Sequence, residues 1–268
     1  MNKIKHKARK RFGQNFLHDH GIIRRIIACI APKEGQHIVE IGPGKGALTE
    51  GLISVTKSMD VVELDRDLIP ILKVNLFRYP ELRVHEADAM KFDFSQLARE
   101  GNLRVVGNLP YNISTPLIFH LLSQASFIDD MHFMLQKEVV DRLAARPGDS
   151  LYGRLSVMAQ YYCQVDFLFI VGPESFDPAP KVDSAIVRMR PHKEKPYLAH
   201  SFDTLEKVVR IGFQQRRKTL RNNYKGVLDS TDFDTLEIDA GLRPERLDVS
   251  DFVRIANFVH SKELNDVN

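Results

Sequence analysis

The sequence of 268 residues contains no tryptophan and only two cysteines, Cys29 and Cys163. Two isolated cysteines exclude a disulfide framework and the paired spacing of a zinc site, so we expect free thiols and no metal centre. No apolar run approaches the roughly 20 residues that a membrane-spanning helix requires. Residues 1–16 also lack the apolar stretch of a secretory signal. These absences predict a cytoplasmic protein without a membrane partner.

What the chain does contain is typical of a folded protein, since 43% of its residues are hydrophobic and 27% are charged. The net charge of +3 conceals two basic blocks. Residues 3–11 carry six Lys or Arg and no acid, and residues 207–225 carry seven and no acid. Because contacts of Lys and Arg with phosphates release condensed counterions, two such blocks indicate a polyanionic partner. A solvated tail or helix face is the alternative for either block alone.

Short apolar strands alternate with helical segments through most of the chain. The expected strands are residues 37–41, 59–64, 82–87, 103–108, 132–136, 165–171 and 184–190. Strand–helix alternation requires crossover connections, which place parallel strands in one sheet and helices on both of its faces. The predicted fold class is therefore α/β, with a Rossmann-like, doubly wound and mostly parallel sheet.

The pattern changes after Pro196, where three short helical segments follow one another without a convincing strand. We place a domain boundary near Lys195. Residues 1–195 are expected to form the cofactor-binding domain with a basic N-terminal tail. Residues 196–268 are expected to form a small, all-helical domain that holds the second basic block.

A glycine-rich loop, GPGKG at Gly42–Gly46, follows the first strand and precedes a helix. Glycines at such a turn, here Gly42 and Gly44, let the backbone pass close to a ligand. The spacing excludes a Walker A loop. Glu63 lies at the end of the second strand, 21 residues after Gly42, where a carboxylate can accept both ribose hydroxyls of an adenosine.

Two more polar residues end the next strands, namely Asp88 and Asn108. Ligands of open α/β sheets bind outside the carboxyl ends of the strands, so these side chains are expected to converge on one crevice. Either acid alone would more often be a helix cap or a solvated loop residue. Together with the glycine loop they predict a site for an adenosine-containing cofactor.

The tetrad Asn108-Leu109-Pro110-Tyr111 indicates the chemistry. The amino nitrogen of adenine is a poor nucleophile, and accepting hydrogen bonds from both of its hydrogens favours the pyramidal transition state. The side-chain oxygen of Asn108 and the carbonyl of Leu109 can supply those two acceptors. Pro110 removes a backbone donor and fixes φ. Tyr111 offers a flat face on which an extruded base can stack. The tetrad therefore predicts methylation of a base amino nitrogen.

Several motifs together resemble the ribosomal RNA adenine N6-dimethyltransferases, and most of all the bacterial small-subunit type whose loss gives kasugamycin resistance. These motifs are RFGQNFL (11–17), EIGPGKGALT (40–49), NLPYNISTP (108–116), MLQKEV (134–139), FDPAPKVDSAIV (176–187) and QRRKTLRN (215–222). The resemblance spans about residues 8–259. It implies a class I methyltransferase that uses S-adenosylmethionine to place two methyl groups on each of two adjacent adenosines. Those adenosines lie in the hairpin near the 3′ end of 16S ribosomal RNA, within the 30S subunit or its precursor, and we expect the enzyme to be a monomer.

The same resemblance assigns site residues by motif. It implies cofactor contacts for Asn15, Leu17, Gly42, Glu63, Asp88 and Asn108, with Glu63 on the ribose and Asp88 towards the adenine. It also implies that Tyr111 and Phe176 sandwich the target base. Stacking of a base on an aromatic is worth ~1–3 kcal/mol, although Phe176 could instead pack beneath its proline-rich loop. Lys181 is either a phosphate contact or an ordinary surface lysine.

The two basic blocks supply the candidate RNA contacts. They are Lys7, Arg9, Lys10 and Arg11 in the first block and Arg216, Arg217, Lys218 and Arg221 in the second. Such residues are expected to read ribosomal RNA by its shape and its phosphates.

Three other functions share part of this pattern. A dehydrogenase would have the glycine loop and Glu63 but no use for the tetrad. A methyltransferase acting on 23S ribosomal RNA would share all the motifs and differ only in substrate. A mainly non-catalytic ribosome-assembly factor would recognise immature small subunits. For the favoured function we expect an in-line transfer of the methyl group without a covalent enzyme intermediate, in which the protein orients and desolvates the reactants.

Overall fold

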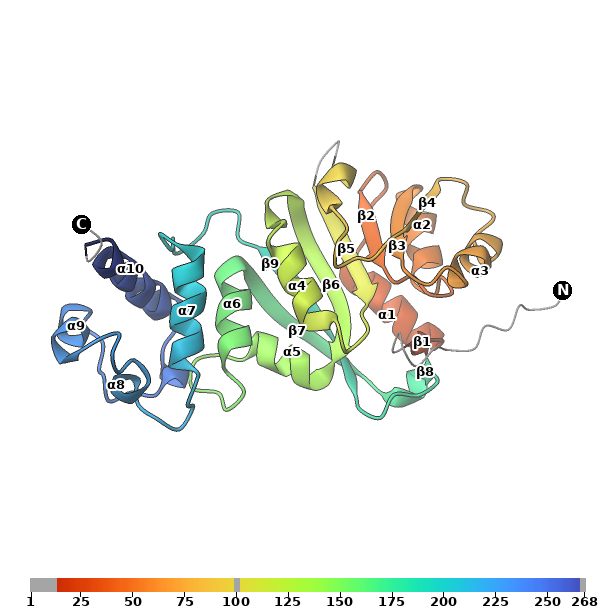
Figure 1. Ribbon diagram of the computed structural model, residues 1–268. Coiled ribbons are helices and arrows are strands. Elements are labelled where there is room, and N and C mark those ends of the chain that lie inside the picture. The colour runs from red at the N-terminus through yellow and green to blue at the C-terminus, as the bar shows by residue number, and fades with distance from the viewer. Residues whose placement is uncertain (1–13, 99–101, 266–268) are drawn as a thin grey trace. The chain divides into compact units, whose positions relative to one another are not determined.

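The computed structural model describes residues 14–98 and 102–265, which form two compact units (Figure 1). The first unit comprises the chain up to Val140 together with Asp166–Pro191, and the second comprises Asp141–Val165 together with the chain from His192 onward. The predicted boundary near Lys195 falls close to this division. Residues 141–165, which the prediction assigned to the first domain, belong to the second unit.

A seven-stranded sheet forms the centre of the first unit, in the order β4-β3-β2-β5-β6-β9-β7. The strands are β2 (Ile38–Ile41), β3 (Met59–Glu63), β4 (Leu82–Glu86), β5 (Leu103–Asn108), β6 (Ile128–Gln136), β7 (Cys163–Val171) and β9 (Ser184–Pro191). Strands β2 to β6 pair in parallel, and β9 pairs with β6 in antiparallel fashion. The predicted α/β fold with a mostly parallel sheet is confirmed.

Helices connect these strands, as the alternation of the sequence predicts. They are α1 (His20–Ile30), α2 (Thr49–Thr56), α3 (Leu68–Asn75), α4 (Ser114–Leu122) and α5 (Lys137–Ala144), with 3-10 turns η2 (Phe94–Leu97), η3 (Ala125–Phe127) and η4 (Pro173–Ser175). Strands β2 and β3 are buried along their whole length, because helices cover both of their faces. This burial fixes the strand register, and the register brings the strand ends to one edge.

A second, two-stranded sheet joins segments that are far apart in the sequence. Strand β1 (Phe16–Leu17) pairs with β8 (Phe176–Asp177) in antiparallel fashion, with Leu17 opposite Phe176. The amide of His18 also donates to the carbonyl oxygen of Ser175 at 3.0 Å. The pairing therefore places the end of the RFGQNFL motif, Phe16–Leu17, beside the FDPAP loop.

A buried carboxylate ties three neighbouring segments of the first unit together. Asp60 on β3 is 1% exposed and accepts hydrogen bonds from His37 Nε2 and His85 Nε2, each at 2.7 Å. The guanidinium of Arg83 adds two more, at 2.7 and 3.0 Å. Burial alone would raise the pKa of Asp60, but these donors outweigh it and hold the pKa well below its usual range.

The second unit is built from helices. They are α6 (Arg154–Tyr162), α7 (Phe202–Gly212), α8 (Leu220–Asn223), α9 (Ser230–Thr235) and α10 (Val249–Asn265), with a 3-10 turn η5 (Pro244–Arg246). Helix α6 packs on α7 and α10, which is why residues 141–165 belong here. In its core the Tyr224 hydroxyl donates to the carbonyl oxygen of Val208 at 2.9 Å. Within the described part of the chain no helix is long and apolar enough to cross a membrane.

Candidate active site

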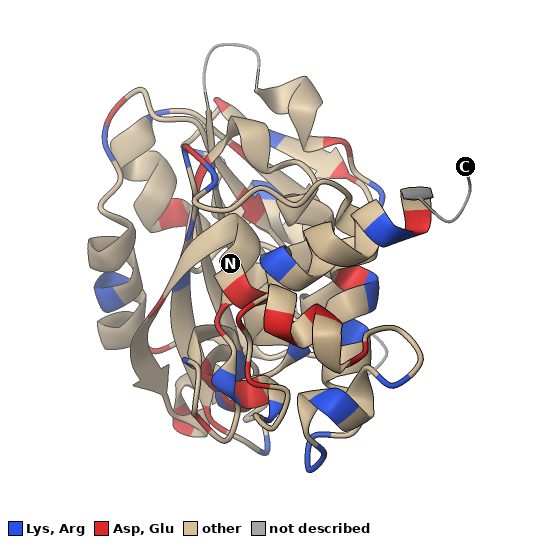
Figure 2. Ribbon diagram, turned by 90° about the vertical axis from the view of Figure 1, so that its left-hand side faces the viewer, with Lys and Arg blue, Asp and Glu red and all other residues tan. Residues whose placement is uncertain are grey.

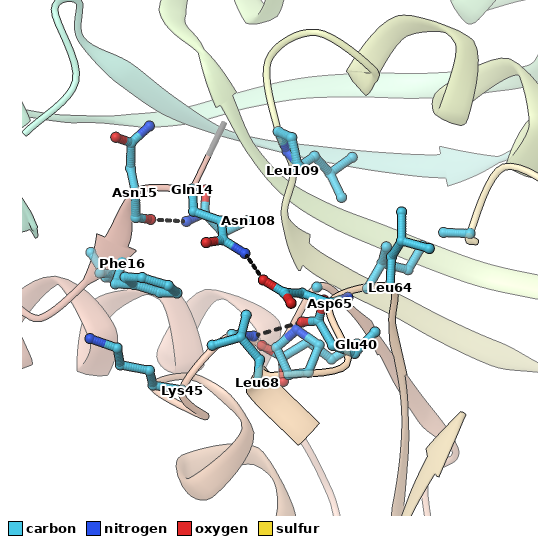
Figure 3. Close-up of a pocket in the computed structure, with 18 of the residues that line it drawn as sticks. Gln14, Asn15, Phe16, Glu40, Lys45, Leu64, Asp65, Leu68, Asn108 and Leu109 are labelled. Carbon is cyan, nitrogen blue, oxygen red and sulfur yellow. Dashed lines mark hydrogen bonds between the residues drawn. The ribbon is translucent and has the colours of Figure 1, made fainter. Parts of the chain in front are cut away.

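A cavity of about 410 Å³ opens at the carboxyl ends of the parallel strands of the first unit (Figure 3). All of the predicted cofactor residues line it, namely Asn15, Leu17, Gly42, Gly44, Glu63, Asp88 and Asn108. The tetrad residues Leu109, Pro110 and Tyr111 line the same cavity. The structure therefore brings the cofactor motifs and the tetrad into one site.

The glycine loop forms the floor of this cavity in a conformation that requires glycine. Gly42 and Gly44 have φ values of +66° and +58°, which side chains disfavour. A Cβ on Gly44 would also lie 3.2 Å from a ring carbon of Phe16. The close approach of β1 to the loop thus depends on the missing side chain.

Glu63 is held by the backbone on both carboxylate oxygens. The amide of Asp65 donates to Oε1 at 2.8 Å, and that of Gly44 donates to Oε2 at 3.3 Å. Burial raises the pKa of Glu63, while these backbone donors oppose the rise. The carboxylate is therefore pre-oriented at the end of β3, and it keeps lone pairs for the two hydroxyls of a ribose. This arrangement fits an adenosine-containing cofactor.

We expect Glu63→Gln to weaken the binding of S-adenosylhomocysteine roughly 10- to 100-fold, because a hydrogen bond to a charged acceptor contributes more than a neutral one. Isothermal titration calorimetry measures this change. Glu86→Gln is the matched control. Glu86 lies on β4, directly opposite Glu63 of β3 in the sheet register, but its side chain is exposed. Equal affinities for the Glu63 variant and the unaltered protein would contradict the ribose role.

Sequence reasoning missed another acid of the cavity, Glu40 on β2. The hydroxyl of Thr49 donates to its Oε2 at 2.6 Å. Burial raises the pKa of Glu40 to about 7, with the Thr49 bond opposing the rise and the nearby charge of Glu63 adding to it. The sequence feature that could have identified Glu40 is an acid inside an otherwise apolar strand, two residues before the glycine loop.

Because S-adenosylmethionine is cationic, it favours the ionised form of Glu40. That form predominates only above a pH of about 7, so cofactor affinity is expected to rise as the pH increases from 6 to 8. The change cannot exceed about tenfold per pH unit for one proton. Calorimetric titrations at several pH values test this, and Glu40→Gln is expected to flatten the profile. An unchanged slope in that variant would assign the titration to another group.

At the other end of the cavity, Asn108 ends β5 with a defined orientation. Its Nδ2 donates to the backbone carbonyl oxygen of Asn15 at 3.1 Å, which leaves Oδ1 as the acceptor for a ligand (Figure 3). The amide of Leu109 donates to Met134 at 3.1 Å, and the amide of Ile113 closes the turn on Pro110 at 3.2 Å. The tetrad is therefore a fixed turn.

Residues 14–18 form one wall of this cavity. Gln14 Nε2 donates to Asp65 Oδ2 at 2.8 Å, while the backbone of Asn15 contacts Asn108. The ammonium of Lys45 lies 4.4 Å from the centre of the Phe16 ring. Gln14, Phe16 and Asp65 line the cavity, and sequence reasoning did not single them out.

Phe176 occupies a different place from the one that the resemblance implied. Its side chain is 4% exposed and packs in the core beneath its loop. Within residues 14–98 and 102–265, the part of this loop that lines the cavity is Asp177. Of the two interpretations of Phe176, the structure shows the packed one. A base could stack on this ring only if the ring turned outward.

The predicted RNA contacts differ in their surroundings. Lys7, Arg9, Lys10 and Arg11 lie outside the described residues, and Lys181 is exposed. In the second unit Arg217, Lys218 and Arg221 are exposed, and Figure 2 shows basic and acidic residues interspersed over its helices. Arg216 is exposed as well, and its Nη2 donates to the carbonyl oxygens of Ser150 and Tyr152, at 2.6 and 2.9 Å. Arg216 therefore also holds a loop of its own unit.

Within the described chain no group of three or more His, Cys, Asp or Glu residues could hold a metal ion. Cys29 and Cys163 are free thiols.

A mostly parallel sheet with a glycine loop after its first parallel strand and an acid that ends the next is shared with dehydrogenases, but the tetrad Asn108–Tyr111 in the same cavity is typical of a class I methyltransferase that uses S-adenosylmethionine. Residues 5–261 match the family described as "Ribosomal RNA adenine dimethylase", and the chain belongs to this family. It is therefore an enzyme that dimethylates adenine in ribosomal RNA.

Relatives and solved structures agree with this family. The chain is 82% identical over 259 residues to "Ribosomal RNA small subunit methyltransferase A" from Marinomonas sp. (strain MWYL1), which covers 96% of this chain and 97% of the relative. The Pseudomonas putida protein of the same name is 60% identical, with coverages of 96% and 97%. A dimethyladenosine transferase from Plasmodium falciparum superposes with a TM-score of 0.77 at 29% identity, covering 94% of this chain and 98% of that one. The 23S rRNA methyltransferase ErmE gives 0.69 at 25% identity, with coverages of 92% and 100%.

Proposed function

We propose that the enzyme dimethylates two adjacent adenosines in the hairpin near the 3′ end of 16S ribosomal RNA, acting as a monomer in the cytoplasm on the 30S subunit or its precursor. The proposed catalysis is supported above all by one observation: Asn108–Tyr111, Glu63 and the glycine loop all line the same cavity. The choice of 16S over 23S ribosomal RNA is supported by the 82% identity to a small-subunit methyltransferase, against 25% to ErmE.

The polar groups that line the cavity fit S-adenosylmethionine. When bound, this cofactor supplies a methyl group that is already activated on a sulfonium. Glu63 would hold the ribose and Asp88 would contact the adenine, since both line the cavity, and the backbone at Gly42 and Gly44 allows close approach. The carboxylate of Glu63 is thus held in place by backbone hydrogen bonds before this reactant binds. Such preorganisation lowers the barrier by orientation.

The tetrad acts on the other reactant. Asn108 Oδ1 and the carbonyl oxygen of Leu109 accept the two amino hydrogens of the target adenine, while Tyr111 supports the face of the base. S-adenosylmethionine would supply the methyl group to this amine: the carbon–sulfur bond would break as the carbon–nitrogen bond forms, with its electron pair remaining on sulfur. The amine then releases a proton to water. A second turnover on the same nitrogen gives the dimethylated product.

Labelled S-adenosylmethionine and unmethylated ribosomal particles test this proposal. Unmethylated 30S subunits, naked 16S RNA and 23S RNA are incubated separately, and the modified nucleotides are mapped. We expect two methyl groups on each of two adjacent adenosines in the 3′ hairpin of the 16S RNA. Label in 23S RNA, or at isolated adenosines elsewhere in 16S RNA, would overturn the substrate assignment.

A further inference from the structure

Tyr111 is anchored by two serines, one at each end of the residue. The hydroxyls of Tyr111 and Ser184 lie 2.8 Å apart. The hydroxyl of Ser114 donates to the main-chain carbonyl oxygen of Tyr111 at 3.2 Å. Both serines are 1% exposed, whereas Tyr111 is half-buried and lines the cavity. The tyrosine therefore faces the ligand while its two polar ends are held from behind.

Ser184 lies in the central sheet, whereas Tyr111 lies in the turn that follows β5. Ser184 begins β9 and pairs in register with Gln136 at the end of β6. The amide of Lys137 also donates to the carbonyl oxygen of Asp183 at 2.9 Å. Tyr111 lies in a turn, where its side chain has several rotamers open to it. A bond to a hydroxyl fixed in the sheet selects one of them.

We propose that Ser184 is a positioning residue for methyl transfer, because its hydroxyl holds the Tyr111 side chain in one rotamer and so keeps the ring where the target adenine can stack on it. The inference rests on the proposed function, in which Tyr111 is the stacking surface. Stacking needs parallel faces, and productive geometry tolerates only about 10–20° of misorientation. Ser184 does not line the cavity, so its effect passes through Tyr111.

The desolvation of the Tyr111 hydroxyl supports the same assignment. Burial raises the pKa of Tyr111, and the bond from Ser184 opposes the rise. The hydroxyl is therefore neutral at physiological pH and serves as an anchor rather than as a base. Without Ser184 this half-buried hydroxyl would lose a partner, and the ring would turn to find water.

A double-mutant cycle of Ser184→Ala and Tyr111→Phe tests the inference, because each change removes one side of the same hydrogen bond. We expect each single variant to lower kcat roughly 3- to 10-fold, with the Kd of S-adenosylhomocysteine unchanged. The double variant is expected to be no slower than the slower single variant. Ser123→Ala, a change of an exposed serine, is the matched control and should keep full activity. A Ser184→Ala loss that is equally large in the Tyr111→Phe background would overturn the inference.

Fluorescence of an RNA that carries 2-aminopurine at the target position reports stacking directly. Ser184→Ala should reduce the quenching of this base in the complex, and full quenching would overturn the inference. Tyr111→Ala distinguishes the stacking role of Tyr111 from the positioning role of Ser184. If Tyr111→Ala keeps full methylation, the proposed role of the tetrad aromatic fails. If Tyr111→Ala is impaired and Ser184→Ala is not, only the positioning role of Ser184 fails.

Discussion

Replacing Asn108 with alanine is expected to lower kcat for adenine methylation roughly 100- to 1,000-fold, the range found when one preorganised hydrogen-bonding group of a transition state is removed. Two oxygens are proposed to accept the amino hydrogens of the adenine, and Asn108 Oδ1 is the one that belongs to a side chain, so the substitution removes it. Single-turnover assays with labelled cofactor measure the chemical step, and filter binding measures the affinity for RNA. We expect the RNA affinity to stay within a factor of about three, since phosphate contacts dominate it.

The matched control for this variant is Asn102→Ala. Asn102 directly precedes β5, at the end of the strand opposite to Asn108, and it is exposed. Its Nδ2 donates to Asp129 Oδ1 at 2.8 Å, so removing this side chain should leave kcat nearly unchanged. Asn108→Asp adds a second comparison. An aspartate keeps the acceptor but places a carboxylate against the carbonyl oxygen of Asn15, which now accepts from Nδ2. We expect it to be impaired as well. Full activity of Asn108→Ala would remove the proposed role of the tetrad.

Asp60→Asn is expected to lower the free energy of unfolding at pH 7 by about 3–5 kcal/mol, because it removes one partner from a buried charged network. Asparagine keeps the shape of the side chain but cannot balance Arg83 or accept from His37 and His85 at once. Chemical denaturation followed by circular dichroism measures the loss. Glu34→Gln, a change of an exposed acid in the same unit, should alter stability by less than about 0.5 kcal/mol.

The same carboxylate predicts a dependence of stability on pH. The pKa of Asp60 is lower in the folded state than in the unfolded chain, so its contribution is fully present above the unfolded value of about 3.9. The contribution is lost progressively as the pH falls below that value. The difference in stability between the unaltered protein and Asp60→Asn should therefore shrink on acidification. A difference that stays constant down to pH 3 would contradict this assignment.

Local patterns in the sequence were sufficient to predict the strand ends that build the cavity. Glu63 and Asn108 could be placed because apolar runs mark β3 and β5, and parallel strands bring their carboxyl ends to one edge. The register of a buried strand follows from its hydrophobic pattern, so little else is needed. For the same reason the glycine loop and the tetrad were expected in one crevice, and the structure confirms that they are.

The features that sequence reasoning missed depend on contacts between distant segments. Strands β1 and β8 have two residues each, which is too short for any periodicity, and their pairing is set by tertiary packing. For Phe176 the sequence left stacking and packing open as alternatives, and its burial at β8 becomes visible only in the structure. Helix α6 likewise has ordinary local character, and only its packing on α7 and α10 assigns it to the second unit.

The short ribbon of β1 and β8 has a practical consequence for handling the protein. One wall of the cofactor cavity is formed by residues 14–18, so any cleavage or deletion that reaches this stretch also leaves Phe176–Asp177 without a pairing strand. Limited proteolysis near the start of the chain, with and without S-adenosylhomocysteine, would therefore serve as a simple assay of ligand occupancy.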